Sequence, residues 1–411
     1  MRDQLLGRPL RDLDLFVDAD PAEIVRALPH AVSIEAHTPV VKVPPRSGES
    51  ALEITTPGPG ASDLRENLER RDFTINAIAF DPRSESYLDP TGGRADLAAR
   101  TLRTPRPESA FREDPIRILR GLRLAAELDL EAEPATRHAM QRDAPLLTRA
   151  PGERLRDELL RILELERPSE VIETMRRNGA LAALLPELLR LVGVAQNAHH
   201  PDDVYRHSLR VCDACAARPM LRFAALLHDV AKPETKRWSR HRGDFTFLRH
   251  DVLAGGHLQH VAARLRLSRR QLDVLERLVR HHLLVPRQLE SAAAVRRMLR
   301  RVGIDILDDL LDLRGADLAS RTSDGRVPSD WRDTAERILQ AAAGLQTEPL
   351  EPLAIGGKQI MRDLGIREGR EVGRWLRLAR RRVTELPDEN DAERLLAWIR
   401  ESRKREEGEE A

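Results

Sequence analysis

Asp12 and Asp14 are the residues whose types and spacing most directly predict chemistry. They lie in residues 11–17 (RDLDLFV), where charged and apolar residues alternate as in a strand. Residues two apart on a strand point to the same face, so we expect the two carboxylates side by side, with Leu13 and Leu15 facing the core. Carboxylates this close repel each other unless a cation lies between them, and hard oxygen ligands suit Mg²⁺. A two-metal site of this kind can activate an attacking hydroxyl and stabilise a leaving pyrophosphate.

A third carboxylate would complete such a site. Glu53, in the alternating residues 52–55 (LEIT), is the candidate. The competing interpretation is an exposed strand edge that carries alternating aspartates and binds no metal. Taken alone, the pattern leaves both interpretations open.

The elements that must position these side chains are short strands near the N-terminus. Strands are predicted at residues 13–17, 40–43 and 52–56, which are β-branched or alternating and bounded by Pro and Gly. From about residue 111 onward, Leu and Ala recur at spacings of three and four, which predicts helices. The predicted fold class is therefore α+β, with a small mixed-sheet head followed by a long all-α body.

The length of 411 residues predicts several domains. Breaks in the helical pattern place the boundaries. We expect a head at residues 1–105, a helical neck that binds nucleotide and RNA at 106–165, a helical domain at 166–325 and a C-terminal helical region at 326–411.

Composition limits how the chain could hold a nucleic acid. Aromatic residues make up 3% of the sequence and the net charge is +1, so base stacking on aromatic side chains is not expected to be the main mode of binding. No long apolar run is present, which predicts a soluble, cytoplasmic chain without a membrane segment. Cys212 and Cys215 fall in a helical stretch, and we expect them to pack rather than to carry redox chemistry.

Four motifs follow one another in the first 165 residues. They are RDQLLGRPLRDLD at residues 2–14, RRDFTINA at 70–77, DPTGGRADL at 89–97 and EDPIR at 113–117. In this order they resemble the class II tRNA nucleotidyltransferase and poly(A) polymerase family, whose head has a polymerase-beta-like nucleotidyltransferase fold. That family has a Gly-Gly pair ahead of the first motif. Here the pair would fall before Met1, and we expect the natural start to lie upstream.

The resemblance and the strand argument together assign a transferase site. Asp12, Asp14 and Glu53 are expected to be catalytic, with Asp12 and Asp14 binding Mg²⁺. The motif at residues 89–97 is expected to scaffold the head. Contacts to the nucleotide are implied for Arg2, Arg71, Asp72, Glu113, Asp114, Arg117, Arg120 and Arg123.

The fourth motif suggests how side chains could select a base without a template. Glu113 and Asp114 are expected to open a helix, with Pro115 in its first turn. Asp114 and Arg117 are three apart and would share a helix face. Arg117 could then donate to O2 and N3 of cytosine while Asp114 accepts from N4, and a small re-orientation would address adenine. A solvated basic helix is the competing interpretation.

A second group of residues predicts another metal site. His207, the adjacent pair His228 and Asp229, then His250 and Asp317 have the order of HD-type metal-dependent phosphohydrolases. The resemblance implies a second divalent metal of unknown identity and phosphatase or phosphodiesterase activity on 2′,3′-cyclic or phosphate ends. The histidines at 281 and 282 are expected nearby. The alternative is a degenerate HD domain that is retained for packing.

The function that follows is a tRNA nucleotidyltransferase. It would add C, A or both to the 3′ end of tRNA from CTP and ATP without a template, releasing pyrophosphate. A poly(A) polymerase shares the same motifs, and an HD phosphohydrolase with an inactive, RNA-binding head is the alternative from another class. The short Pro- and Gly-rich loop between Glu53 and Arg70 resembles that of enzymes that add only the two cytidines.

The C-terminal region is expected to hold the body of the tRNA. Residues 352–361 resemble the family's tail, in which a glycine-containing turn precedes a helical bundle. A basic helical surface would contact phosphates there in a salt-sensitive way. Its arginines are Arg362, Arg367, Arg370, Arg374 and Arg377.

Overall fold

The computed structural model describes most of the chain and divides it into two compact units. The described residues are 1–9, 12–28, 30–34, 40–44, 51–57, 64–197, 202–322, 324–347, 352–366, 369–386 and 389–409. The first unit comprises residues 1–190 and 260–268, and the second comprises residues 191–259 and 269–411.

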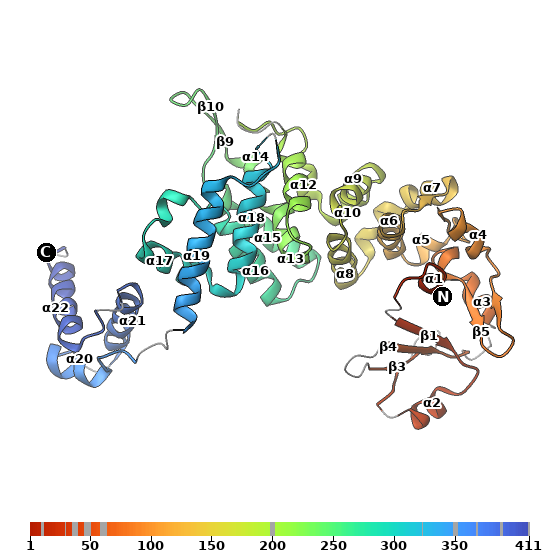
Figure 1. Cartoon of the computed structure of the whole chain (residues 1–411), viewed down its shortest axis with the longest axis horizontal. Coiled ribbons are helices and arrows are strands. Elements are labelled where there is room, and N and C mark those ends of the chain that lie inside the picture. Colours follow the sequence, from red (N-terminus) through yellow and green to blue (C-terminus); the bar gives the residue numbers. More distant parts are fainter. Residues whose placement is uncertain are drawn as a thin grey trace. The chain divides into compact units, whose positions relative to one another are not determined.

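A four-stranded mixed sheet opens the first unit (Figure 1). Its strand order is β1-β4-β3-β2, with β1 parallel to β4 and the other pairs antiparallel. The strands are β1 (Asp12–Phe16), β2 (Val32–Ile34), β3 (Val40–Val43) and β4 (Ala51–Thr55). The predicted mixed sheet and three of its strands are confirmed, while the short β2 was missed.

Helix α2 (Pro21–Ala27) covers one face of this sheet. The carboxylate of Asp20 accepts from the backbone N–H of Ala22 at 2.7 Å, which caps the first turn of the helix. Ile24 of α2 packs with Val41 of β3 and Ile54 of β4 to form the core of the head. The sheet is thereby held in a fixed register at the strands that carry the candidate carboxylates.

The expectation that Leu13 and Leu15 face a closed core was wrong. Their side chains are 46% and 39% exposed. They are in register with Leu52 and Ile54 of β4, but β1 is an edge strand of the described sheet. An edge strand has a neighbour on one side only, so its apolar side chains are covered incompletely.

The remaining elements of the first unit are helices and short strands. Phe73, Ile75 and Phe111 are fully buried in its core. The elements are α1 (Arg2–Leu5), α3 (Leu64–Glu69), η1 (Thr74–Asn76), β5 (Ala79–Asp81), β6 (Ser86–Leu88), α4 (Gly93–Ala98), β7 (Thr101–Leu102), α5 (Ala110–Glu113), α6 (Ile116–Leu128), β8 (Glu131–Ala132), α7 (Pro134–Asp143), η2 (Ala144–Arg149), α8 (Gly152–Leu163), α9 (Pro168–Asn178), α10 (Ala180–Leu184) and α11 (Pro186–Leu189).

Two adjacent glycines explain the motif at residues 89–97. Gly92 has a φ of 76°, a left-handed conformation that favours glycine. A Cβ at Gly93 would lie 2.0 Å from the carbonyl oxygen of Thr74, so the backbone of α4 touches the backbone of η1. Asp89 accepts from the backbone N–H of Gly93 at 2.7 Å and fixes the turn. These contacts support the scaffolding role expected of the motif.

The second unit is mainly helical. Its elements are α12 (Val204–Ala214), α13 (Pro219–Leu227), α14 (Lys232–Thr235), β9 (Lys236–Ser239), β10 (Asp244–Phe247), α15 (His250–Arg264), α16 (Arg269–His281), η3 (Pro286–Leu289), α17 (Ala292–Val302), η4 (Ile304–Ile306), α18 (Leu307–Ala319), α19 (Ser329–Thr347), α20 (Gly357–Leu364), α21 (Arg370–Glu385) and α22 (Ala392–Glu409). Helix α15 is divided between the units, because its last residues, 260–264, are assigned to the first unit.

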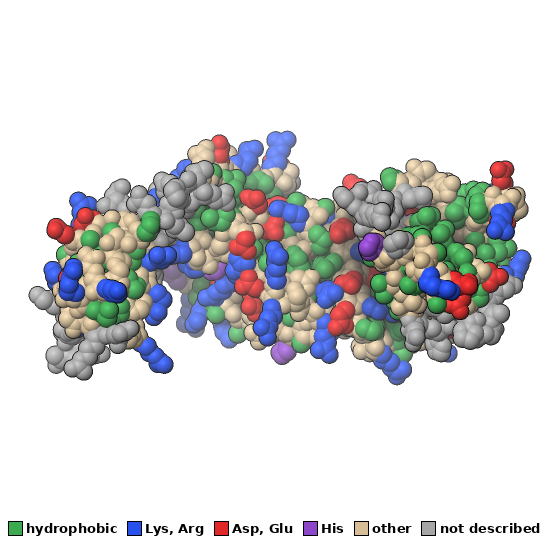
Figure 2. Space-filling view, turned by 90° about the horizontal axis from the view of Figure 1, so that it is seen from below, with side chains coloured by type: hydrophobic (Ala, Val, Ile, Leu, Met, Phe, Trp, Pro, Cys, Tyr) green, Lys and Arg blue, Asp and Glu red, His purple; other side chains and the backbone are tan. Residues whose placement is uncertain are grey.

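Two features of this unit matter for function. The β9–β10 hairpin interrupts the helices, where the helical pattern had predicted only a break (Figure 1). Helices α20, α21 and α22 enclose a core of their own around Ile360, Trp375 and Leu395. Lys and Arg side chains are interspersed with Asp and Glu over the displayed surface, in line with the net charge of +1 (Figure 2).

Candidate active site and metal centre

The register of β1 against β4 brings two of the predicted catalytic carboxylates together. Asp14 and Glu53 are direct partners across the parallel pair, and Asp12, two residues earlier in β1, is in register with Ala51. Partners in a sheet project to the same face. Arg71, from the second motif, places Nη1 3.7 Å from Oδ2 of Asp14. Two motifs that are distant in sequence therefore meet at this strand.

The carboxylates of this site are accessible and already face cations. The Asp14 side chain is 60% exposed, and Oε2 of Glu53 lies 3.2 Å from Nζ of Lys42 on β3. Exposed ion pairs of this kind contribute about 0–1 kcal/mol each, so a divalent ion that binds several carboxylate oxygens can displace them. The oxygen donors fit Mg²⁺.

A continuous chain of polar contacts links the first helix to the neck. Arg2 donates from Nη1 to Oδ1 of Asn76 at 2.7 Å, and Asn76 donates from Nδ2 to Oδ1 of Asp72 at 3.0 Å. The other oxygen of the buried Asp72 accepts from Arg120 at 3.1 Å. Three residues with an implied role in nucleotide binding, Arg2, Asp72 and Arg120, are therefore held by one network.

Glu158 of α8 extends this network and was missed as a site residue. It is 4% exposed, and its carboxylate lies 2.9 Å from Nε of Arg123 and 3.6 Å from Nε of Arg120. Burial alone would lower the pKa of Arg120, but the nearby Asp72 and Glu158 outweigh it and raise that pKa. The sequence does contain a signal: Glu158 is an acidic residue between Leu155 and Ile162 on the buried face of α8.

The fourth motif differs from the expected helix opening. Glu113 ends α5, Asp114 is extended, and Pro115 is the N-cap of α6. The reason is that Asp114 acts as a cap, because Oδ1 accepts from the backbone N–H of Ile116 at 3.3 Å. Glu113 therefore belongs to α5 rather than to the start of α6, while Asp114 precedes α6 and caps it.

The side chains of Asp114 and Arg117 do not pair with each other in this structure. Asp114 accepts two hydrogen bonds from Arg154 of α8, at 3.1 and 2.7 Å. Arg117 donates to the carbonyl of Arg70 at 3.2 Å and lies 4.0 Å from Glu113, which Arg106 holds with two hydrogen bonds of 2.8 Å. Arg106 and Arg154 had not been singled out in the sequence.

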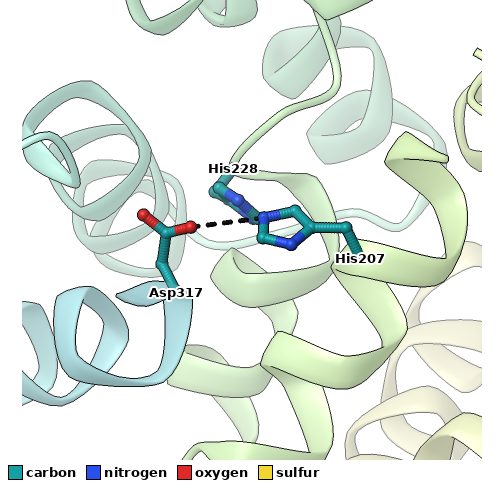
Figure 3. A group of neighbouring side chains, drawn as sticks. All are labelled: His207, His228 and Asp317. Carbon is teal, nitrogen blue, oxygen red and sulfur yellow. Dashed lines mark ion pairs between the residues drawn. The ribbon is translucent and has the colours of Figure 1, made fainter. Parts of the chain in front are cut away.

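In the second unit, three helices bring together predicted metal ligands (Figure 3). His207 comes from α12, His228 follows the last residue of α13, and Asp317 comes from α18. Residues 221–227 of α13 are all buried, so the helix delivers His228 to the interior. Nε2 of His207 lies 3.2 Å from Oδ1 of Asp317.

The remaining predicted ligands lie in the same cluster. Asp229 places Oδ1 3.2 Å from Nε2 of His250, and Oδ2 3.0 Å from Nε2 of His228. His282 joins them, with Nε2 3.3 Å from Nε2 of His250. The neighbouring His281 instead lines a groove with Arg280 and Arg301. Only the buried member of the His281–His282 pair therefore belongs to the cluster.

Hydrogen bonds set the orientation of all four imidazole rings. Three of them use Nδ1 to bond the backbone carbonyl three residues earlier, at 2.6 to 2.8 Å: His228 to Ala225, His250 to Phe247 and His282 to Val279. Nδ1 of His207 lies 3.0 Å from the Ser320 hydroxyl. A histidine whose Nδ1–H is donated presents the lone pair of Nε2, the usual state of a metal ligand.

Cations surround the two buried aspartates. Lys232 lies 2.6 Å from Asp229, while Arg314 and Arg321 each lie 2.7 Å from Asp317. Burial would raise the pKa of Asp229, but His228 and Lys232 hold it well below its usual range. Burial likewise opposes ionisation of Asp317, and its pKa is held low by contacts that include Arg321. Both carboxylates are therefore ionised and suited to bind a cation.

Burial and the neighbouring His228 act on the pKa of His282 in the same direction. Its pKa is lowered to about 3, mainly by burial and then by His228. Nε2 of His228 is buried and has no hydrogen-bond partner among the residues that the structure describes. Imidazole Nε2 atoms that lie close to one another, together with ionised carboxylates, fit a divalent transition metal.

The fold and these two clusters define a class of protein: a nucleotidyltransferase head with an arginine-rich neck, in a chain that also has a helical unit with a buried histidine–aspartate cluster. Residues 1–103 match the family model described as the Poly A polymerase head domain. Residues 129–191 match the model described as a probable RNA- and SrmB-binding site of polymerase A.

Individual proteins narrow this class. The chain is 34% identical over 409 residues to a multifunctional CCA protein of Verminephrobacter eiseniae, covering 92% of this chain and 95% of that protein. It is 33% identical over 402 residues to an A-adding tRNA nucleotidyltransferase of Deinococcus radiodurans, covering 92% and 88%. The crystal structure of the Bacillus stearothermophilus CCA-adding enzyme with CTP superposes with a TM-score of 0.68 at 26% identity, covering 99% and 92%. The chain belongs to the family of CCA-adding nucleotidyltransferases, which confirms the predicted family.

Helices that could cross a membrane were also sought. None of the helices formed by the described residues combines the necessary length with sufficient apolar character.

Proposed function

We propose that this chain adds nucleotides to the 3′ end of tRNA. The observation that carries the proposal is the meeting of Asp14, Glu53 and Arg71 on one accessible strand face. In the reaction the RNA 3′-hydroxyl forms a bond to the α-phosphorus of CTP or ATP, and the bond to pyrophosphate breaks. Mg²⁺ held by Asp12 and Asp14 would polarise the reacting oxygens and offset the developing charge. Arg71 would hold the triphosphate beside these carboxylates. We also propose that the reaction takes place in the cytoplasm, on the basis of the proposed tRNA substrate.

Selection of the base is assigned to Asp114 and Arg117. Both side chains have other partners in this structure. To bind the edge of the base, Asp114 must release Arg154 and Arg117 must move away from Glu113. The relatives include multifunctional CCA proteins and an A-adding enzyme. Residues 58–63 of the loop that predicted addition of cytidines alone lie outside the described residues. Addition of C alone therefore stays a prediction that the assay below decides.

The test uses purified chain, Mg²⁺, tRNA that ends before CCA, and labelled CTP or ATP in turn. Asp14→Asn should reduce incorporation by at least a hundredfold, because the metal loses an oxygen ligand. Asp18→Asn, an exposed carboxylate beyond the same strand, is the matched control and should leave incorporation unchanged. Undiminished incorporation by Asp14→Asn would contradict the transferase proposal. Tailing of any RNA with ATP alone would favour a poly(A) polymerase.

A groove in the second unit could hold the body of the tRNA. Its volume is about 1150 Å³. Arg280, Arg297, Arg300, Arg301, Arg377 and Arg380 line it, together with a single carboxylate, Asp251. Of the predicted C-terminal surface, Arg377 lies in this groove, whereas Arg362 pairs with Asp363 at 2.7 Å. Arg367 lies outside the described residues. Phosphate contacts here predict tRNA binding that weakens steeply with salt.

We also propose that the histidine–aspartate cluster binds a divalent metal and hydrolyses phosphoesters. The support is the orientation of the four Nε2 atoms, with Lys232, Arg314 and Arg321 available to offset the charge of an anionic substrate. With a 2′,3′-cyclic phosphate end, water adds to phosphorus and one P–O bond breaks, which leaves a phosphomonoester and a free hydroxyl. The bound metal would supply Lewis acidity and lower the pKa of water.

Metal binding can be measured without relying on hydrolysis. Titration calorimetry with Mn²⁺ and Ni²⁺ should show binding that His228→Ala removes, and the metal content of the purified chain should fall in the same variant. His138→Ala, an exposed histidine of α7, is the control and should bind as the unaltered chain does. Binding that survives His228→Ala would show that the cluster is a packing remnant.

A further inference from the structure

The β9–β10 hairpin (Figure 1) lies in the sequence between two residues of the histidine–aspartate cluster, Asp229 and His250. β9 begins at Lys236, seven residues after Asp229, and β10 ends at Phe247, three residues before His250. The carbonyl of Phe247 bonds Nδ1 of His250 at 2.6 Å. The end of β10 is therefore held by a residue of the cluster, and the start of β9 follows Asp229 closely in the sequence.

One face of the hairpin carries a row of aromatic rings and ammonium groups. Trp238 and Phe245 are opposite each other in register, and their rings meet edge to face with centroids 5.1 Å apart. Nζ of Lys236 lies 4.1 Å from the centroid of the Phe245 ring. Lys236 is itself opposite Phe247. Because residues two apart share a face, the row extends from Trp238 to Phe247.

The inner end of this row reaches the cluster through Lys232. Its Nζ lies 5.3 Å from the centroid of the Phe247 ring and 2.6 Å from Oδ2 of Asp229. A ring face and a carboxylate therefore share one ammonium group. The row thus connects the surface of the hairpin to the residues that hold the metal.

The outer end of the row is open to solvent. Trp238 is 58% exposed, whereas Trp331 and Trp375 are buried, and Leu248 beyond β10 is 74% exposed. Large apolar side chains exposed together mark binding surfaces more often than ordinary surface. Aromatic residues make up only 3% of the chain, so we interpret the exposed Trp238 as part of a ligand-binding surface near the histidine–aspartate cluster.

The charge of the hairpin identifies the sign of that ligand. Residues 236–249 contain five Lys and Arg side chains and one acidic side chain, Asp244. Arg240 and Arg242 at the turn are exposed, and within the described part of the chain neither is paired with a carboxylate. A basic turn beside an aromatic ring is the combination that holds single-stranded nucleic acid, through phosphates and stacked bases.

We propose that the β9–β10 hairpin binds the single-stranded end of an RNA and presents its terminal phosphate to the metal cluster. A base near the end stacks on Trp238, Arg240 and Arg242 contact the backbone, and the terminal phosphate lies at the cluster. This inference deepens the proposed hydrolase activity, on which its kinetic test rests.

Distance favours an oligonucleotide over a free nucleotide. Trp238 is in register with Phe245, two positions beyond Phe247, which is about 7 Å along the strand. Phe247 is in turn separated from Asp229 by the ammonium group of Lys232. A ligand that contacts Trp238 and the cluster together must span both intervals, so it needs more than one nucleotide.

The test compares two substrates of the full chain loaded with Mn²⁺: hexacytidylate ending in a 2′,3′-cyclic phosphate, and bis(p-nitrophenyl) phosphate. Trp238→Ala should raise KM for the hexamer about tenfold, the expected loss for one stacked base, with kcat unchanged. Hydrolysis of the small diester should be unaffected. Trp238→Phe keeps a ring and should stay near the unaltered chain.

Tyr87→Ala is the matched control. Tyr87 is also an exposed ring on a two-stranded hairpin, paired with Phe80 at 5.2 Å, but it lies in the first unit. It should leave both substrates unaffected. An unchanged hexamer KM in Trp238→Ala would overturn the inference and leave a protein as the occupant of the hairpin. Equal losses on both substrates would also overturn it, because they would indicate a structural role.

Binding can be followed even if the cluster hydrolyses neither substrate. In that case the hydrolase proposal fails, and tryptophan fluorescence tests the hairpin alone. Quenching by the hexamer that disappears in Trp238→Phe supports RNA binding at the hairpin. Absence of quenching overturns the inference.

Discussion

Replacing Glu158 by glutamine should lower the free energy of unfolding of the first unit and also weaken nucleotide binding. The change keeps the shape of the side chain and removes its charge. Glu158 is 4% exposed and faces Arg123 at 2.9 Å and Arg120 at 3.6 Å. Removing one partner of a buried ion pair costs about 3–5 kcal/mol. Asp72 still holds Arg120 and Glu127 still holds Arg123, so we expect a loss of about 2–3 kcal/mol, below that range.

The two units allow this loss to be located. All four tryptophans of the chain lie in the second unit, so their fluorescence reports that unit, while circular dichroism reports both. In urea, Glu158→Gln should lower the midpoint of the helical transition of the first unit and leave the fluorescence transition in place. The KM for CTP should rise about tenfold, equivalent to about 1.4 kcal/mol, because Arg120 and Arg123 lose the carboxylate that positions them.

Glu153→Gln provides the control on the same helix. Its side chain is exposed, and surface substitutions of this kind usually change stability by less than about 0.5 kcal/mol. The reasoning is refuted if Glu158→Gln changes the free energy of unfolding by no more than this control does. It is also refuted if the KM for CTP stays at its original value while the protein is destabilised.

Three further predictions concern packing and protonation. Gly93→Ala should destabilise the first unit by about 3 kcal/mol through overpacking, since its Cβ would lie 2.0 Å from a backbone oxygen. Gly255 has open space around it, so Gly255→Ala should be neutral or slightly stabilising. Urea titrations measure both changes. Cys212 and Cys215 are buried and burial raises the pKa of both thiols, so neither should react with a disulfide reagent at pH 8 until the chain is denatured; labelling of the native protein would contradict this. The pKa of His282 is lowered to about 3, so the folded state binds fewer protons than the unfolded state. Below pH 6.5 the unfolded state takes up a proton that the folded state does not, so the free energy of unfolding falls as the pH drops towards 3. In the metal-free protein we expect a loss of about 2 kcal/mol between pH 7 and pH 5. His282→Asn should lose less over that interval when unfolding is followed by fluorescence.

The sequence predicted the head well where a local pattern decides the structure. Alternation predicted strands at residues 13–17 and 52–56, which the structure places one residue earlier, at Asp12–Phe16 and Ala51–Thr55. Alternation cannot reveal which strands are neighbours, so the partnership of Asp14 with Glu53 rested on analogy until the register was known. The exposure of Leu13 was missed for the same reason, because it depends on β1 being an edge strand.

Contacts between distant residues set the limits elsewhere. Asp114 was assigned to a helix from its spacing to Arg117, but its carboxylate caps α6 and binds Arg154, forty residues away. The order of the histidines and aspartates predicted that these side chains gather in one buried cluster, while metal binding by the cluster stays a prediction. The choice of His282 over His281 could not be predicted, because α16 ends at His281 and the sequence does not reveal which of the two side chains turns inward.

The cations that pair with the cluster aspartates have a consequence for how the protein is assembled. Many metal domains cannot fold until the ion arrives, because the ligands repel one another without it. Here Lys232, Arg314 and Arg321 neutralise Asp229 and Asp317 within the protein itself. We therefore expect the second unit to fold before it binds an ion. It should also stay folded when the ion is released, so that release does not expose the chain to proteolysis. If the cluster binds a metal as proposed, the supply of metal in the cell would set the fraction of molecules with an occupied cluster, without changing the number of folded molecules.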